Sequence, residues 1–280
     1  MTVRVWVDGR LRDAGEASLT AVDHGVTVGD GAFETAKIVD GRAFALSRHA
    51  RRLDRSLAGL GLPAADHDIL TEGIRAVLKA GDSITFGRVR YTVTAGPAPL
   101  GSDRADPPAL TYIVTAVDQP RPPRSGAVVT VPWTRNERSA TAGLKTTSYA
   151  DNVVALVYAK ARGGVEAVFA NTRGELCEGT GSNIFVVLDG TVVTPPADSG
   201  LLEGITRELL LEWCRDDGMR VEERPLPLDI LRTADEVFIT SSTRDVLAVH
   251  GVDDRPLEPG PVTARAAKVF AERSSEDVDP

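Results

Sequence analysis

Two side chains in the second half of the sequence are suited to covalent and proton-transfer chemistry. Lys145 follows Leu144 and precedes a run of hydroxyl-bearing residues, and an amine in such a place can form an imine and act as a general base. Glu178 lies further along the chain, beside Gly179 and just before an apolar segment. Taken singly, a lysine of this kind is most often a solvated surface residue, and the glutamate could simply be solvated as well.

Two further segments have the composition of anion-binding sites. Gly204, Ile205 and Thr206 come directly before a helical pattern, and free backbone amides at a helix start form a phosphate site. The alternative is a plain threonine cap of that helix. The apolar segment that begins at residue 236 ends in four hydroxyl-bearing residues, 240–243, which suit an anion or simply satisfy turn amides.

The first part of the chain predicts an α+β domain. Alternation over residues 3–7, followed by Asp8-Gly9, indicates a strand and a hairpin turn. A glycine-rich segment, 23–35, leads into a strand that ends at a second turn, Asp40-Gly41. Helices are predicted at about 47–60, capped by Ser47, and at about 67–80. Two long strands are expected at 84–96 and 109–117.

A proline-rich segment, DQPRPPRSG at 118–126, predicts the domain boundary. We expect a small domain over 1–118, a linker over 119–125 and a large domain over 126–280. In the large domain the pattern predicts a strand at 127–133, a helix in the latter half of 144–164 and a strand at 183–187. The polar tail, 272–280, is expected to be frayed.

The composition is that of an ordinary globular protein and argues against several functions. The 280 residues are 42% hydrophobic and 26% charged, which is enough to bury a core without disulfides or metals. Lys and Arg number 32 and Asp and Glu number 40, and this net charge of −8 argues against a nucleic-acid or anionic-membrane binder. Cys177, Cys214 and four histidines are too few and too scattered for a zinc site. No segment suits a signal peptide or a membrane span, so we expect a cytoplasmic protein.

Taken together and in order, these motifs resemble those of the class IV aminotransferases, the fold-type IV pyridoxal-phosphate enzymes. That family includes D-amino acid and branched-chain aminotransferases and aminodeoxychorismate lyase. The matching segments are DHGVTVGDGAFET (23–35), HARRL (49–53), Lys145, EGTGSNIF (178–185), EGITR (203–207) and EVFITSST (236–243). The resemblance implies a two-domain α+β fold, with a smaller N-terminal α/β domain that shapes the substrate pocket and a larger cofactor-binding domain with a β-barrel-like core.

The resemblance also implies pyridoxal 5'-phosphate as the cofactor and a role for each motif residue. Lys145 would be the catalytic residue, binding the cofactor as a Schiff base and moving the substrate proton. Glu178 would keep the pyridine nitrogen protonated. Arg52 would hold the phosphate, and Tyr149 is a candidate donor to the ring oxygen. The other implied cofactor ligands are Ile205, Thr206 and Ser242, while Asn183 would order the Glu178 loop.

Substrate residues are expected chiefly on strands of the first domain. Phe33, Thr35 and Lys37 alternate along one strand and therefore share a face, which the resemblance implies lies near the cofactor. Arg88 and Arg90 share a face in the same way, to bind a substrate carboxylate or to meet solvent. The predicted substrate residues are Phe33, Lys37, Arg88, Arg90 and Thr243.

The sequence departs from two subgroups of the family. Leu100 and Ser102 stand where D-amino acid transaminases usually carry an arginine and a histidine, and the Tyr-x-Arg signature of branched-chain enzymes is not evident. We expect a homodimeric transaminase acting on an amino acid and a 2-oxo acid by a ping-pong mechanism, with D-amino acids favoured. The alternatives are an aminodeoxychorismate lyase that forms 4-aminobenzoate and pyruvate, a branched-chain L-amino acid aminotransferase, and a non-catalytic cofactor-binding protein.

Overall fold

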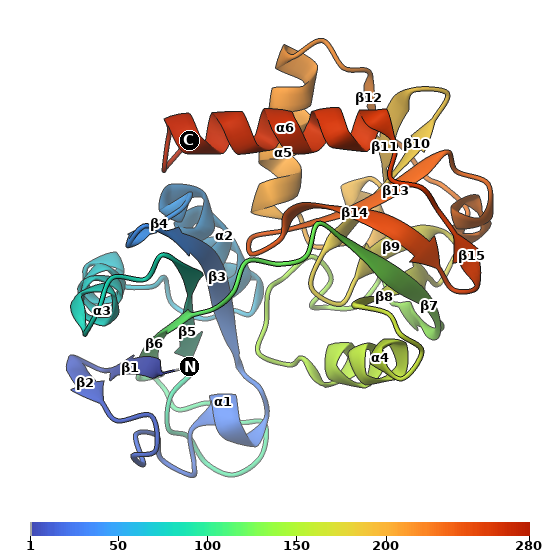
Figure 1. Ribbon diagram of the computed structural model, residues 1–280. Coiled ribbons are helices and arrows are strands. Elements are labelled where there is room, and N and C mark those ends of the chain that lie inside the picture. The colour runs from blue at the N-terminus through green and yellow to red at the C-terminus, as the bar shows by residue number, and fades with distance from the viewer. Residues whose placement is uncertain (1) are drawn as a thin grey trace. The chain divides into compact units, whose positions relative to one another are not determined.

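The computed structural model describes residues 2–280 and divides into two compact units (Figure 1). The first unit comprises Met1–Arg121, Leu144–Tyr149 and Val278–Pro280, and the second comprises Pro122–Gly143 and Ala150–Asp277. The first boundary lies within the predicted linker. Two short segments, 144–149 and 278–280, belong to the first unit although the predicted boundaries assign them to the second domain.

The first unit is built on a six-stranded antiparallel sheet. Its strands, in spatial order, are β2 (Arg10–Arg12), β1 (Val3–Val7), β6 (Thr111–Asp118), β5 (Phe86–Thr94), β3 (Gly31–Val39) and β4 (Arg42–Ala43). The turns at Asp8-Gly9 and Asp40-Gly41 both have two residues with positive φ, as a type I′ hairpin turn requires. The predicted strands of this unit are therefore confirmed.

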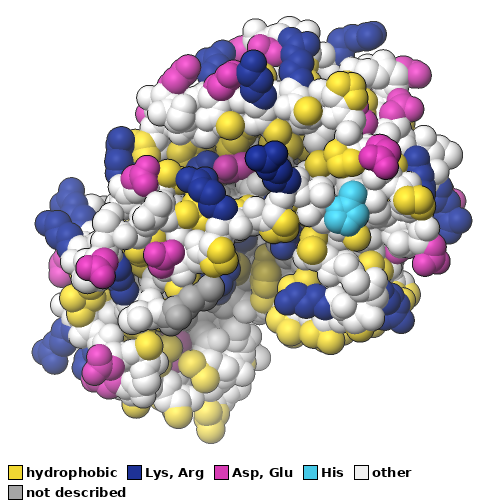
Figure 2. Space-filling model, in the orientation of Figure 1, with side chains coloured by type: hydrophobic (Ala, Val, Ile, Leu, Met, Phe, Trp, Pro, Cys, Tyr) yellow, Lys and Arg dark blue, Asp and Glu magenta, His cyan; other side chains and the backbone are white. Residues whose placement is uncertain are grey.

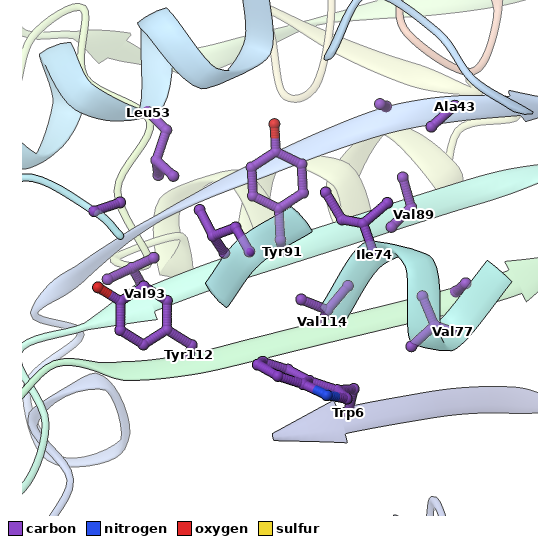
Figure 3. Close-up of a cluster of buried hydrophobic side chains, with 14 of the residues drawn as sticks. Trp6, Ala43, Leu53, Ile74, Val77, Val89, Tyr91, Val93, Tyr112 and Val114 are labelled. Atoms are coloured by element: carbon purple, nitrogen blue, oxygen red, sulfur yellow. The ribbon is translucent and has the colours of Figure 1, made fainter. Parts of the chain in front are cut away.

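Helices α2 (Leu46–Gly59) and α3 (His67–Lys79) pack on one face of this sheet, while α1 (His24–Thr27) is a single turn. Their apolar residues recur at helical spacing and meet large side chains of the strands, among them Trp6 and Tyr91 (Figure 3). Other members of this core are Leu53, Leu57, Ile74, Val77, Val89, Val93 and Val114.

The N-terminus of α2 shows that two predictions were wrong. Ser47 is not the N-cap: the cap residue is Ala45, in the left-handed region at φ 56°, and it makes no side-chain hydrogen bond. The carboxylate of Asp279 accepts instead from the Ser47 amide at 2.8 Å and from its hydroxyl at 2.5 Å. The Ala45 amide also donates to the carbonyl of Val278 at 2.7 Å. The final residues are thus bonded to this helix and not frayed.

The second unit contains a nine-stranded mixed sheet that curls into a half barrel. The main path runs β12 (Val221–Glu223), β11 (Thr191–Thr194), β10 (Asn183–Leu188), β13 (Glu236–Ser241), β14 (Asp245–Val252), β7 (Ser125–Arg135), β8 (Glu166–Asn171) and β9 (Leu176–Gly179), with β15 (Arg255–Pro256) beside β14. The α-helices are α4 (Ala150–Lys160), α5 (Ile205–Asp216) and α6 (Pro261–Glu276), and η1 (Ala197–Ser199) and η2 (Leu228–Arg232) are 3-10 turns. The mixed α+β class is as predicted.

Candidate active site

The backbone of Lys145 is held on two sides within the first unit. Its carbonyl accepts from the Phe33 amide of β3 at 3.0 Å, and its amide donates to the hydroxyl of Ser56 on α2 at 3.1 Å. The segment continues along β3, where the Thr147 amide donates to the carbonyl of Gly31 at 2.8 Å. Lys145 therefore extends from a short, sheet-like segment whose position is set by β3 and α2.

The side chain of Lys145 lies among aromatic rings and near a second cation. Its Nζ is 4.5 Å from the centre of the Phe33 ring and 5.7 Å from the centre of the Tyr149 ring. The two rings meet edge to face, with centroids 5.2 Å apart. The Arg90 guanidinium lies 3.6 Å from the centre of the same Phe33 ring. Four of the predicted site residues, Lys145, Tyr149, Phe33 and Arg90, are thus brought together.

The register of β3 and β5 places the predicted cations on one face of the sheet. Thr35 is directly opposite Arg90, and Lys37 is directly opposite Arg88. Arg88 and Arg90 are exposed, whereas Lys37 is 5% exposed and its Nζ lies 4.5 Å above the ring of Phe44. Although Arg90 is exposed, the partial loss of its hydration lowers its pKa; Tyr149 acts in the opposite direction, and the charge of Arg88 adds a smaller lowering.

Arg52 lies in a buried ionic cluster on the opposite face of β3, and sequence reasoning assigned no role to the other members of that cluster. Its Nε and Nη2 donate to the two carboxylate oxygens of Glu34 at 2.8 and 2.6 Å. The Nδ1 of His49 is 2.6 Å from the same carboxylate. Tyr91, directly opposite Glu34 on β5, is buried beside them. Arg52 is therefore held in a fixed, bidentate geometry.

The cluster has a defined charge state. Burial alone would raise the pKa of Glu34, but the Arg52 charge and hydrogen bonds, with the help of His49, outweigh burial and hold that pKa well below its usual range. Burial lowers the pKa of His49, and the charges of Arg52 and Lys145 add to this effect against the opposing Glu34. At neutral pH the carboxylate and guanidinium are ionised, and the lowered pKa of His49 favours its neutral imidazole.

Glu178 is fixed by two partners within the second unit. It ends β9, is 9% exposed, and accepts a hydrogen bond from the Leu202 amide at 2.9 Å. The Nε of Arg135, at the end of β7, is 3.2 Å from its other carboxylate oxygen. Sequence reasoning missed Arg135, which begins a polar run with no motif. The Leu202 amide and the Arg135 guanidinium thus fix the position of the carboxylate.

The predicted anion site lies at the N-terminus of α5. Its N-cap is Gly204, and among residues 2–280 no side chain caps the helix. Ile205 and Thr206 are buried in the first turn, whose amides have no partner within the helix. A Cβ at Gly204 would lie 2.1 Å from the amide oxygen of Asn183, so a larger residue would displace that side chain. The Asn183 side chain in turn donates to the Leu202 carbonyl at 2.7 Å, ordering the Glu178 partner.

Ser242 and Thr243 lie in the half-buried turn between β13 and β14. Arg244, in the same turn, donates to Glu166 of β8 at 2.5 Å. Glu166 also accepts from the amide of Thr180 at 3.0 Å and from its hydroxyl. This buried carboxylate, which the sequence reasoning did not single out, ties the turn at Ser242 to the turn that follows Glu178.

The residues present have the chemistry that pyridoxal phosphate requires. An amine held against aromatic rings suits covalent attachment, a buried carboxylate held by an amide and an arginine suits a protonated pyridine nitrogen, and uncapped amides of a helix start suit a phosphate. Within residues 2–280, no group of three or more His, Cys, Asp or Glu side chains is placed to hold a metal ion. No helix in that range is long and apolar enough to cross a membrane.

Comparison with known proteins agrees with this chemistry. The family model for amino-transferase class IV matches residues 31–252. A putative branched-chain-amino-acid aminotransferase of Methanocaldococcus jannaschii is 31% identical over 96% of this chain and 95% of its own. Aminodeoxychorismate lyase of Bacillus subtilis is 31% identical over 89% and 87%, and D-alanine aminotransferase of Bacillus licheniformis is 29% identical over 93% of each chain.

A solved structure shows the same fold with the cofactor bound. An aminotransferase from Brucella abortus, bound to pyridoxal phosphate, has a TM-score of 0.89 and 26% identity, covering 98% of this chain and all of its own. Family members use this cofactor, and relatives with aminotransferase and lyase activities are similar to this chain over nearly its full length. The chain belongs to the class IV aminotransferases, the fold-type IV enzymes that use pyridoxal phosphate.

Proposed function

We propose that the protein is a transaminase that moves an amino group between an amino acid and a 2-oxo acid in two half-reactions, with D-amino acids as preferred donors. One observation carries the proposal. The amine of Lys145 and the guanidinium of Arg90 lie 4.5 and 3.6 Å from the centre of one ring, that of Phe33. A reacting amine and a fixed cation are thus close enough for one small amino acid to meet both.

Lys145 would hold the cofactor covalently, and its amine would carry a proton to or from the substrate Cα. Pyridoxal phosphate, when bound, supplies the electron sink that stabilises charge at that carbon. Glu178 keeps the pyridine nitrogen protonated, and its two partners, Leu202 and Arg135, keep the carboxylate in position. A neutral amide at 178 would weaken that effect.

Phosphate binding is assigned to the first turn of α5 and to the side chains of Arg52 and Ser242. The amides of Ile205 and Thr206 are oriented along the helix axis, where its dipole favours an anion. Arg52 contributes a donor of fixed orientation, because its Nε and Nη2 are held by the two carboxylate oxygens of Glu34. Ser242 is assigned to the same phosphate, and the phenol of Tyr149 to the ring oxygen.

Substrate recognition is assigned to the sheet face that carries Phe33 and Arg90. Arg90 binds the carboxylate next to the reacting carbon, and Phe33 packs against the substrate carbons. Thr243, in the turn that follows β13, is proposed to donate to the same substrate.

Two alternative functions are suggested by the names of similar proteins. Aminodeoxychorismate lyase of Bacillus subtilis and the branched-chain relative of Methanocaldococcus jannaschii are as similar to this chain as the D-alanine enzyme is. Both reactions begin with removal of the Cα proton, so Lys145 serves either. The D-amino acid preference rests on Arg90, an alternative to the arginine and histidine replaced here by Leu100 and Ser102.

The test uses purified holoenzyme and follows the absorption of the bound cofactor. Conversion of the cofactor to its aminated form by D-alanine but not by L-leucine supports the proposal. Reaction with L-leucine alone favours a branched-chain L-amino acid aminotransferase. Consumption of aminodeoxychorismate with neither conversion identifies a lyase. Lys145→Ala should abolish all of these reactions, and the control Lys79→Ala, at an exposed position on α3, should leave them unchanged.

We also propose that the protein forms a homodimer through the outer face of α4. Val153, Val154 and Val157 are 58%, 54% and 63% exposed, and hydrophobic side chains gather over this helix in Figure 2. Contiguous apolar surface of this kind is typical of an interface. Light scattering should report a dimer for the native chain and a monomer for Val154→Lys combined with Val157→Lys. A native monomer would contradict the proposal.

A further inference from the structure

Three positions on α2 share one face of the helix, and two of them contact the segment that carries Lys145. Arg52, Ser56 and Gly59 are spaced four and three residues apart, so they are neighbours on the helix surface. The Ser56 hydroxyl accepts a hydrogen bond from the Lys145 amide at 3.1 Å. A Cβ at Gly59 would lie 2.6 and 2.7 Å from the two methyl carbons of Leu144. The glycine therefore makes room for Leu144, and the serine binds the residue that follows it.

Both hydrogen-bonding capacities of Ser56 are in use, and its side chain is 1% exposed. Its hydroxyl donates to the Arg52 carbonyl, one turn earlier in α2, at 3.0 Å, while its oxygen accepts from Lys145. A serine that bonds back to the preceding turn slightly destabilises a helix, so helix stability gives no reason for a serine here. The contact that an alanine could not provide is the one to Lys145.

Ser56 closes a ring of hydrogen bonds that joins Arg52 to Lys145. On one side, Arg52 donates to the carboxylate of Glu34 on β3 at 2.6 and 2.8 Å, and the amide of the adjacent Phe33 donates to the Lys145 carbonyl at 3.0 Å. On the other side, the Lys145 amide donates to Ser56, which donates to the backbone of Arg52. A shift of any one member would lengthen at least two of these bonds. The ring therefore restrains the position of Lys145 relative to Arg52.

We infer that Ser56 is a positioning residue, which acts on the reaction only by fixing the backbone of Lys145 relative to Arg52. This inference rests on the proposed function, in which Lys145 is the reacting amine and Arg52 binds the phosphate. Without the Ser56 hydroxyl, the half-buried amide of Lys145 loses an acceptor, which favours a different backbone position. A displacement of about 1 Å in a reacting group can lower a rate by up to about 100-fold.

The first test measures how fast a reactive amino acid aminates the bound cofactor of the holoenzyme, followed by absorption over a range of amino acid concentrations. Ser56→Ala should lower the rate at saturation about tenfold, equivalent to about 1.4 kcal/mol. The half-saturating concentration should change by less than about twofold, because Ser56 affects the lysine and not the binding of the substrate. Ser56→Thr should recover most of the rate, because a threonine hydroxyl can bond to the preceding turn in the same way.

The matched control removes a buried hydroxyl elsewhere in the molecule. Thr194, a buried residue of β11, donates from its hydroxyl to the Ile184 carbonyl at 2.8 Å. Thr194→Val should change the rate at saturation by less than about twofold. Equal rates for the native protein and Ser56→Ala would overturn the inference, and so would an equal loss of rate in Thr194→Val.

The second test does not depend on turnover. Amide hydrogen exchange of the holoenzyme, followed by NMR, reports the protection of the Lys145 amide directly. In Ser56→Ala this amide should exchange about tenfold faster, while the amides of β6 keep their native rates. An unchanged Lys145 amide, or an equal increase throughout the first unit, would overturn the inference. If no amino acid reacts with the native holoenzyme but the Lys145 amide responds as expected, the proposed function fails and the positioning by Ser56 remains.

Discussion

Replacing Glu34 by glutamine is a direct test of the buried cluster in the first unit. Glu34 accepts two hydrogen bonds from Arg52 and faces the imidazole of His49, and all three side chains are buried. Glutamine keeps the shape of the side chain but removes its charge. The Arg52 guanidinium would then lie in the core without the carboxylate that now balances it.

The expected cost follows from the burial of that charge. Removing one partner of a buried ion pair costs about 3–5 kcal/mol in the free energy of unfolding. We expect the lower value, about 3 kcal/mol, because the amide oxygen of glutamine still accepts one hydrogen bond. For a chain of this length, each kcal/mol lowers the Tm by about 2 °C, so the Tm should fall by about 6 °C.

Far-UV circular dichroism during thermal and urea unfolding at pH 7 measures both quantities. Glu72→Gln is the matched control, because Glu72 is exposed on α3, and it should change stability by less than about 0.5 kcal/mol. Adding Arg52→Met to Glu34→Gln should recover part of the loss, since it removes the uncompensated charge. A loss below about 1 kcal/mol for Glu34→Gln, with no recovery in the double variant, would refute this reasoning.

Three further outcomes are expected. Asp279→Ala should reduce stability by about 1 kcal/mol in urea unfolding, because it removes the carboxylate that caps α2. Burial raises the pKa of Cys177 to about 12 and that of Cys214 to about 11, so neither thiol should react with a thiol reagent at pH 8 until the chain is unfolded. A hydrogen bond from the Thr172 hydroxyl is the main cause that lowers the pKa of Glu137 to about 2. Its stabilising effect should therefore be full above its ordinary pKa of 4.5 and be lost toward pH 2, and acid unfolding of Glu137→Gln should show a weaker pH dependence there.

Local signals in the sequence predicted most elements of both units. The hairpin turns at Asp8-Gly9 and Asp40-Gly41 depend only on residues that tolerate positive φ, so the Asp-Gly dipeptide alone predicts the turn type. The cap of α2 could not, because Asp279 lies 232 residues from Ser47 in the chain. A serine at a helix start is a local signal for a cap. In this protein the capping carboxylate comes from Asp279, which is distant in the chain.

The residues of the candidate site also fall into those that the sequence predicts and those that depend on the folded structure. Lys145 and Glu178 stand in motifs, so a resemblance pointed to them. Glu34 had a physical signal that was overlooked: it occupies the face of β3 shared by Ala32 and Ala36, where alternation predicts an apolar residue. A charged residue in such a position requires a buried partner. Arg135 offered no comparable pattern, because its role depends on the folded positions of β7 and β9.

The order of the chain through the two units has a consequence for recombining this protein with its relatives. The polypeptide leaves the first unit after Arg121, returns for Leu144–Tyr149, leaves again, and comes back at Val278. An exchange of residues 1–121 alone would therefore combine a foreign β3 with the native segment that carries Lys145, across a hydrogen-bonded seam. A chimera that keeps a matched seam must also exchange residues 144–149, and 278–280 if α2 is to keep the carboxylate that caps it.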